Sequence, residues 1–221
     1  MIDLHTHTFF SDGVLVPAEH LRRVEVLGYE AVAITDHVDS SNIDFVLPRI
    51  IQAANDLNLY STTKLIPGIE LTHIPPAMID VLTRQGRELG AQVVVVHGET
   101  VVEPVAPGTN RAAIEAGVDL LAHPGLISEE DVQLAQERGI FLEISGRKGH
   151  SITNGHVARL AEKYHAKLVV CADAHTPNDF LTAKMAKIVA LGAGLSEEQY
   201  VKIRKRMKRF VQKLTPDVVV S

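Results

Sequence analysis

The chain has 221 residues, 46% of them hydrophobic, and its 22 basic and 27 acidic side chains give a formal charge of −5. This composition is typical of a globular protein and excludes one that binds polyanions over its whole surface, although not a local basic patch. One cysteine excludes an intramolecular disulfide framework, and no apolar run approaches the roughly 20 residues of a membrane span. We therefore expect a cytoplasmic protein without a membrane segment, in which any metal is held by imidazole and carboxylate.

Short apolar runs alternate with segments of helical spacing along the chain. The predicted strands are Met1–His5, Ala31–Asp36, Lys64–Leu71, Gln92–His97, Asp119–His123, Phe141–Ser145 and Lys167–Ala172. The predicted helices are Pro17–Leu27, Asn42–Leu57, Ala77–Leu89, Asn110–Ala116, Ser128–Arg138, Asn154–Tyr164 and Asp179–Ala190. Seven successive strand-helix pairs indicate a parallel sheet. A closed or nearly closed barrel is the first expectation, and a doubly wound open sheet is the alternative.

We expect two parts in the chain, a barrel domain over residues 1–195 and a basic C-terminal helix within residues 196–221. The helix is predicted at Glu197–Leu214, where apolar residues recur at helical spacing among seven basic ones. The favoured interpretation is a helix packed on the barrel with a solvated charged face. A basic surface that binds an acidic partner is the alternative.

Nine potential metal ligands fall at or just past the ends of predicted strands. They are His5, His7, Asp12, His37, Glu70, His97, His123, Asp173 and His175. In parallel α/β proteins the carboxyl ends of the strands line one rim, so residues far apart in sequence meet there. Nine ligands exceed the three or four of a single catalytic zinc site, which predicts two or three metals.

Strand alternation assigns directions to some of these side chains. His5 and His7 should point to the same side of the first strand, as should Asp173 and His175 at the seventh. The neighbours Asp36 and His37 should point oppositely, so His37 is the expected ligand and Asp36 an outer hydrogen-bond partner.

The other histidines and the loop after the sixth strand are less clearly assigned. We expect surface or capping roles for His20, His73, His156 and His165, and leave His150 open. Its loop also carries Arg147 and Lys148 on the rim. Because a guanidinium binds phosphate in a bidentate manner, Arg147 is the first candidate for a substrate phosphate and Lys148 the second.

The motifs Asp-Leu-His5-Thr-His7, Ile-Thr-Asp36-His37, His123-Pro-Gly and Ala-Asp173-Ala-His175 resemble those of the PHP (polymerase and histidinol phosphatase) superfamily. The resemblance covers about residues 1–190 and implies a distorted (β/α)7 TIM-like barrel. It also implies a trinuclear centre of Zn, Mn or Fe at the C-terminal rim of the strands. The chain departs from many relatives at Ser145-Gly-Arg147, where they have Asn, so the phosphate contacts are less defined than the metal ligands.

Carried over position by position, the resemblance implies three ligand sets. One metal would be held by His5, His7, Glu70 and Asp173, a second by Glu70, His97 and His123, and a third by Asp12, His37 and His175. Glu70 would bridge the first two.

The expected activity is hydrolysis of a small phosphomonoester, as in histidinol-phosphate phosphatases, with a metal-bridging hydroxide as nucleophile. The catalytic candidates are Glu70, Asp173 and His175, although a side chain that binds metal is a poor free acid. A nuclease or nucleotide phosphatase, or a protein-tyrosine phosphatase, on the same trinuclear site is the alternative, with the basic helix at Lys202–Lys213 as a contact to nucleic acid. A non-catalytic interaction domain stabilised by metals is a third.

Overall fold

The computed structural model describes residues 1–214, and within them seven parallel strands follow one another around a barrel. The strands neighbour one another in the order β1-β2-β4-β5-β6-β7-β8, and the short β3 pairs with β4. Their bounds are β1 Ile2–Asp3, β2 Ala31–Ile34, β3 His37–Val38, β4 Lys64–Leu71, β5 Val93–His97, β6 Leu120–Ala122, β7 Phe141–Ser145 and β8 Lys167–Cys171. Nearly every strand residue is buried, as expected for a parallel sheet covered on both faces.

The barrel closes where the segments after β1 and β8 meet. Thr6 and Ala174 form a parallel bridge, and the backbone N–H of His7 donates to the carbonyl of Ala174 at 2.9 Å. The N–H of Asp173 donates to the carbonyl of His5 at 3.0 Å. The strand order also follows the sequence without reversal, so the barrel expectation is confirmed and the doubly wound open sheet is wrong.

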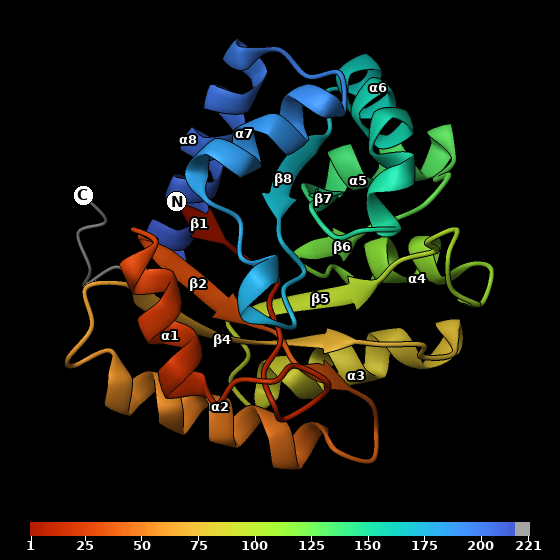
Figure 1. Cartoon of the computed structure of the whole chain (residues 1–221). Helices are drawn as coiled ribbons and strands as arrows, with labels where there is room; N and C mark the ends of the chain where they lie inside the picture. The colour runs from red at the N-terminus through yellow and green to blue at the C-terminus, as the bar shows by residue number, and fades with distance from the viewer. Residues whose placement is uncertain (215–221) are drawn as a thin grey trace.

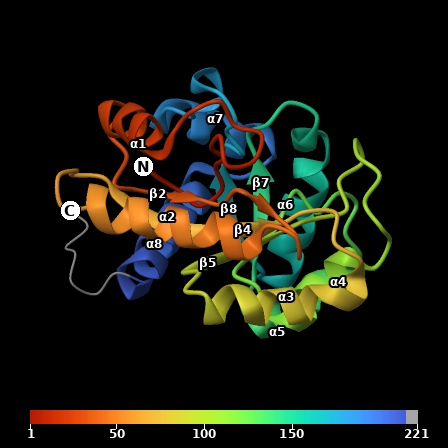
Figure 2. The ribbon, with the colours of Figure 1, turned by 90° about the horizontal axis from the view of Figure 1, so that it is seen from below.

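The helices surround the strands, as Figures 1 and 2 show from two directions. They are α1 Pro17–Val26, α2 Ile43–Leu57, α3 Pro76–Glu88, α4 Thr109–Ala116, α5 Glu129–Arg138, α6 Asn154–Tyr164, α7 Ala183–Gly192 and α8 Glu197–Leu214, with short 3₁₀ helices at η1 His150–Thr153 and η2 Pro177–Asp179. Capping residues set both ends of α5. The hydroxyl of Ser128 accepts from the N–H of Asp131 at its start, and Gly139 ends the helix in the left-handed conformation. No helix in residues 1–214 has the length and apolar character needed to span a bilayer.

Apart from shifts of one or two residues at the ends of other elements, two predicted elements differ from the structure. The expected strand Ala31–Asp36 stops at Ile34 and resumes as β3, with the register against β4 unchanged. Pro67, opposite Ile34, has no N–H to give to the ladder there. The expected helix Asp179–Ala190 begins later, at Ala183, because the hydroxyl of Thr182 caps the N–H of Met185.

Helix α8 packs against β1, β8 and α7. Its buried residues Tyr200, Ile203, Met207 and Val211 recur at helical spacing, so its charged residues face outward. The proposed division at residue 195 stays a prediction, and residues 215–221 of the predicted C-terminal segment lie outside the described residues.

Candidate metal centre

The nine predicted ligands all come to the C-terminal rim of the barrel, where they form adjacent groups. Two of the ligands have an unusual backbone: φ is +24° at His123 and +52° at Asp173, which costs energy in residues other than glycine. Strain of this kind persists where neighbouring contacts hold the side chain in a required direction.

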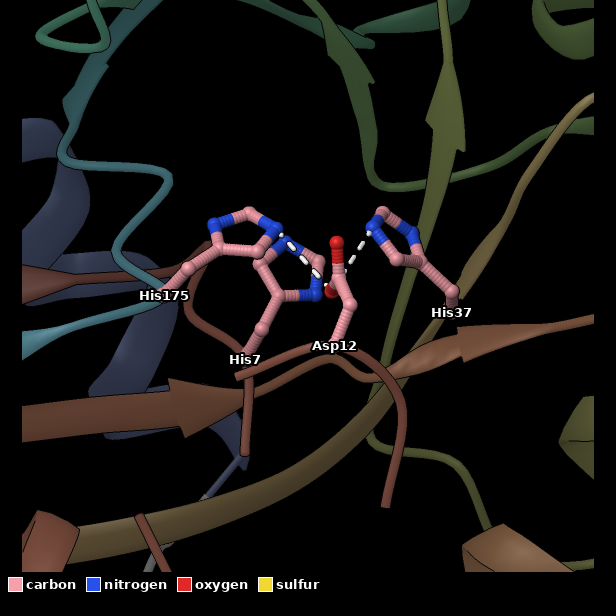
Figure 3. A group of neighbouring side chains, drawn as sticks. All are labelled: His7, Asp12, His37 and His175. Atoms are coloured by element: carbon pink, nitrogen blue, oxygen red, sulfur yellow. Dashed lines mark ion pairs between the residues drawn. The ribbon is translucent and has the colours of Figure 1, made fainter. Parts of the chain in front are cut away.

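One group consists of His7, Asp12, His37 and His175 (Figure 3). One oxygen of Asp12 lies 3.3 Å from Nε2 of His37 and 3.1 Å from Nε2 of His175. The ring of His7 lies 4.2 Å from those of both other histidines, centroid to centroid. The structure therefore brings together the predicted set Asp12, His37 and His175, and places His7 beside it.

Glu70 lies at the centre of the rim, fully buried at the end of β4. Its Oε1 is 3.2 Å from Nε2 of His5, and its Oε2 is 2.6 Å from Nδ1 of His37. Nε2 of His7 is 3.9 Å from Oε2 of Glu70 and 3.2 Å from Oδ1 of Asp173. The two oxygens of Glu70 thus face His5 of the first implied set and His37 of the third. The predicted bridge to the second set, which contains His97 and His123, stays a prediction.

The third group differs from the set that the resemblance implies. His97 and His123 come together as expected, with ring centroids 4.4 Å apart, but the third member is His150 rather than Glu70. His150 stacks on His123 at 4.0 Å, and its Nδ1 is held by the hydroxyl of Thr100 at 2.8 Å. The residue left open by the sequence thus lies within the centre.

A second carboxylate, Glu143, contacts two of the predicted ligands, His5 and His123. The sequence did not identify it as a residue of the site. This fully buried side chain lies 2.9 Å from Nδ1 of His5 and accepts the N–H of His123 at 2.8 Å. Such a contact fixes the tautomer of a histidine and directs Nε2 toward the site. The available signal was its position in the apolar strand Phe141–Ser145, where an unpaired acid would be costly.

Asp36, predicted as a hydrogen-bond partner of a metal ligand, makes different contacts. Its carboxylate accepts from the N–H and hydroxyl of Thr8 and from the hydroxyl of Ser11, at 2.6–2.7 Å. It therefore holds the turn that carries Asp12 rather than a ligating imidazole.

Burial and neighbouring charges shift the pKa values of the clustered histidines in different directions. Burial lowers the pKa of His7 and His123 well below the usual range, with help from neighbouring imidazoles. Burial also opposes charge on His5, but Glu70, Glu143 and Asp173 outweigh it and raise its pKa. For Asp173, burial raises the pKa well above its usual value. Bound cations would favour ionised carboxylates and neutral imidazoles instead.

The chemistry of these side chains fits divalent cations. Within residues 1–214, several buried polar atoms lack a hydrogen-bond partner, among them Nε2 of His5, both ring nitrogens of His7 and Oε1 of Glu70. Unpartnered buried polar atoms cost stability, and their concentration at one rim indicates a bound group that satisfies them. Imidazole and carboxylate suit Zn, Mn and Fe alike.

A cavity of about 240 Å³ opens over the centre. Arg147 lines this cavity. Its guanidinium donates to the carbonyl of Asp173 at 3.1 Å and contacts Nδ1 of His175. Lys148, the second phosphate candidate, is exposed and does not line this cavity. The structure thus places Arg147 beside the metal-binding groups and leaves Lys148 outside them.

The four remaining histidines lie in different environments. His165 occupies the C-cap of α6, as expected, and His156 contacts the carbonyl of Ile127 at 2.8 Å. The surface expectation was wrong for His20, which is 1% exposed on the apolar face of α1 and packs edge-on against Phe180. His73 is exposed, yet it lines the cavity over the centre.

Comparison with known proteins gives a family match and several relatives. The model of the PHP domain family matches residues 3–213. An uncharacterized protein of Methanocaldococcus jannaschii is 48% identical over 199 residues, covering 89% of this chain and 91% of its own length. A protein of Thermoanaerobacter named "Probable phosphatase" is 25% identical over 93% of this chain and 96% of its own length. The ribonuclease P protein component 3 of Methanosarcina mazei is 27% identical over 78% of this chain and 72% of its own.

Solved structures confirm the fold. A chain of archaeal ribonuclease P with mature tRNA superposes with a TM-score of 0.72 at 17% identity, over 99% of this chain and 94% of that one. A chain from the crystal structures of the metal-dependent tyrosine phosphatases YwqE of Bacillus subtilis and CpsB of Streptococcus pneumoniae gives a TM-score of 0.59 at 17% identity, over 90% of this chain and 90% of that one. At these identities the likeness shows the barrel architecture alone.

Proposed function

Since the chain belongs to the PHP domain family, we propose that it is a metal-dependent phosphoesterase that hydrolyses a small phosphomonoester. One observation carries the proposal: all nine predicted ligands are present and meet at one rim, below a cavity that also contains an arginine. In an interaction domain that used metals for stability alone, a cavity with an arginine above the ligands would have no role. The name of one relative, "Probable phosphatase", supports the same reaction class.

The side chains that would hold the cations are the nine predicted ligands together with His150. Divalent cations there would lower the pKa of water and stabilise charge on phosphoryl oxygens. Within the chain, Glu143 holds His5 and His123, and Asp36 holds the turn that carries Asp12. Asp173 and His175 are the candidates for passing a proton to the leaving alkoxide.

We assign the phosphate of the substrate to Arg147. Its guanidinium lies within the cavity lining and is one-third exposed, so it retains donors that a phosphate can use. The contacts to Asp173 and His175 place this cation over the metal-binding groups. An anionic substrate would therefore meet positive charge on two sides.

The size of the cavity favours a small ester over a polymer. About 240 Å³ is below the 300–1,000 Å³ that drug-sized ligands occupy, which suits a phosphoryl group and part of a small alcohol. The basic helix does not extend this site. A groove beside α8 is lined by Arg206 and Arg209 of the helix and by Asp119, Phe141 and Lys167 of the barrel. The three barrel residues lie at the N-terminal ends of their strands, opposite the rim.

A nucleic-acid substrate is the second candidate function, because one relative and one structural neighbour belong to ribonuclease P. The position of α8 argues against a nuclease that uses this helix and the rim together. A nucleic acid on α8 would have to pass around the barrel to reach the metals.

A substrate panel separates these functions. Metal-analysed protein is assayed against histidinol phosphate, nucleotides, phosphotyrosine peptide and single-stranded oligonucleotides. We expect the highest kcat/KM on a small phosphomonoester. Cleavage of oligonucleotides with no phosphomonoesterase activity would replace the first candidate with the second, and no turnover by metal-loaded protein on any substrate would refute both.

A further inference from the structure

The loop between β5 and α4 brings one carboxylate, Glu103, to the mouth of the centre. Its Oε2 is 2.9 Å from Nε2 of His97, and its Oε1 is 3.5 Å from Nε2 of His150. His73 approaches the same carboxylate, with its Nε2 3.3 Å from Oε2. Three imidazoles from three separate segments thus face one glutamate to which the family resemblance gives no role.

The group formed by His97, His123 and His150 includes no carboxylate among its own members. Asp173 approaches two of them, with Oδ2 3.7 Å from Nε2 of His123 and 3.8 Å from Nε2 of His150, but it makes no such contact to His97 in the described chain. Glu70, which the resemblance implies for this metal, reaches within 4.0 Å of His123 only, at 3.9 Å, and no such contact to His97 or His150 exists in the described chain. A dication among neutral imidazoles alone lacks the Coulomb attraction that a carboxylate provides. The negative charge nearest to His97 is that of Glu103.

The separations also suit a shared cation. Ligand atoms about 2.1 Å from one metal lie about 3.0–3.4 Å from each other. Nε2 of His97 is 2.9 Å from Oε2 of Glu103, and Nε2 of His150 is 3.5 Å from Oε1, so these separations fit a carboxylate that turns both oxygens toward one cation. His73, His97 and Glu103 also form one of the groups whose ligand atoms all lie within 4.8 Å of one another.

We propose that Glu103 is a carboxylate ligand of the cation bound by His97 and His150, and that His73 orients it. The backbone of His73 is in the left-handed region, with φ +52°, a strained conformation that places its ring 4.8 Å from that of His97. Glu103 is 37% exposed, so it reaches the metal from the solvent side, unlike the buried Glu70. This inference rests on the proposed metal-dependent function.

The test compares Glu103→Gln with the unaltered chain in binding of Mn²⁺, measured as metal per chain after gel filtration and by competition with a chelator. The amide keeps the shape and removes the charge. We expect loss of one equivalent of Mn²⁺, or a weakening of one site by at least about tenfold. The visible spectrum of the Co²⁺-loaded protein should change as well, because a ligand is lost. His73→Ala should weaken the same site less.

Glu115→Gln, an exposed carboxylate on α4, is the matched control and should bind metal as the unaltered chain does. Unchanged Mn²⁺ stoichiometry and affinity in Glu103→Gln would overturn the inference. If His123→Ala nevertheless loses metal, the proposed function stands without Glu103. If the unaltered chain binds no Mn²⁺, Zn²⁺ or Fe²⁺, both fail.

Discussion

Glu143 offers a way to perturb the centre without touching a predicted metal ligand. Its two oxygens serve two donors, the ring of His5 at 2.9 Å and the N–H of His123 at 2.8 Å. In Glu143→Gln the amide has the same shape but only one acceptor oxygen. If that oxygen keeps His5, the amide NH₂ faces the N–H of His123, donor against donor.

Two magnitudes follow from this geometry. A buried N–H left without an acceptor costs about 1–3 kcal/mol of unfolding free energy. Loss of the carboxylate that orients a ligating histidine reduces metal affinity about 10–100-fold, or about 1.4–2.7 kcal/mol. Glu143→Gln should therefore bind Zn²⁺ or Mn²⁺ 10–100-fold more weakly while keeping the fold.

The assay is chelator competition, together with circular dichroism to confirm the fold and urea titration to measure stability. Glu137→Gln, an exposed carboxylate on α5, is the control and should match the unaltered chain. Equal metal affinity in Glu143→Gln and Glu137→Gln would show that the contact to His5 does not support metal binding.

Three further predictions concern the substrate, the buried imidazole and the basic helix. Arg147→Ala should raise KM for the phosphomonoester about 5–30-fold, which corresponds to about 1–2 kcal/mol of lost charge-assisted bonding, with a smaller change in kcat; an unaltered KM would remove Arg147 from the site. Burial lowers the pKa of His20 to about 3, so the folded state disfavours its protonation. Stability from neutral His20 is full above the unfolded pKa of about 6.5 and is lost as pH falls toward 3, which costs about 2 kcal/mol at about pH 5. In urea titrations, His20→Leu should reduce the fall in unfolding free energy at acid pH. The control His165→Gln should show the same fall as the unaltered chain. Arg206→Glu with Arg209→Glu should leave phosphomonoesterase kinetics unchanged, and a large fall in kcat/KM would contradict the separation of α8 from the rim.

The sequence predicts the barrel and the rim well because both follow from periodicity. Alternation of apolar runs with helical segments indicates parallel strands, and the strand ends then place His5, His97 and His123 on one rim. The pairing of His5 with His7 also holds, since their rings lie 5.0 Å apart.

What the sequence could not indicate was the contribution of residues outside strand ends. Glu103 lies in a loop, and nothing local shows that the loop folds back over His97. Glu143 lies inside a strand, where the direction of its side chain depends on register. His20 is different: it follows Pro17 by three residues and precedes Val24 by four, so the apolar spacing of α1 already indicated burial.

Glu70→Gln tests the central claim most directly, by measuring metal per chain and phosphomonoesterase kcat/KM on the same samples. Glu70 is buried among His5, His7, His37 and His123, so removal of its charge should affect more than one cation. We predict that metal content and activity fall together. Full activity with unchanged metal content would contradict the role of Glu70 as a carboxylate that bridges two cations of the centre.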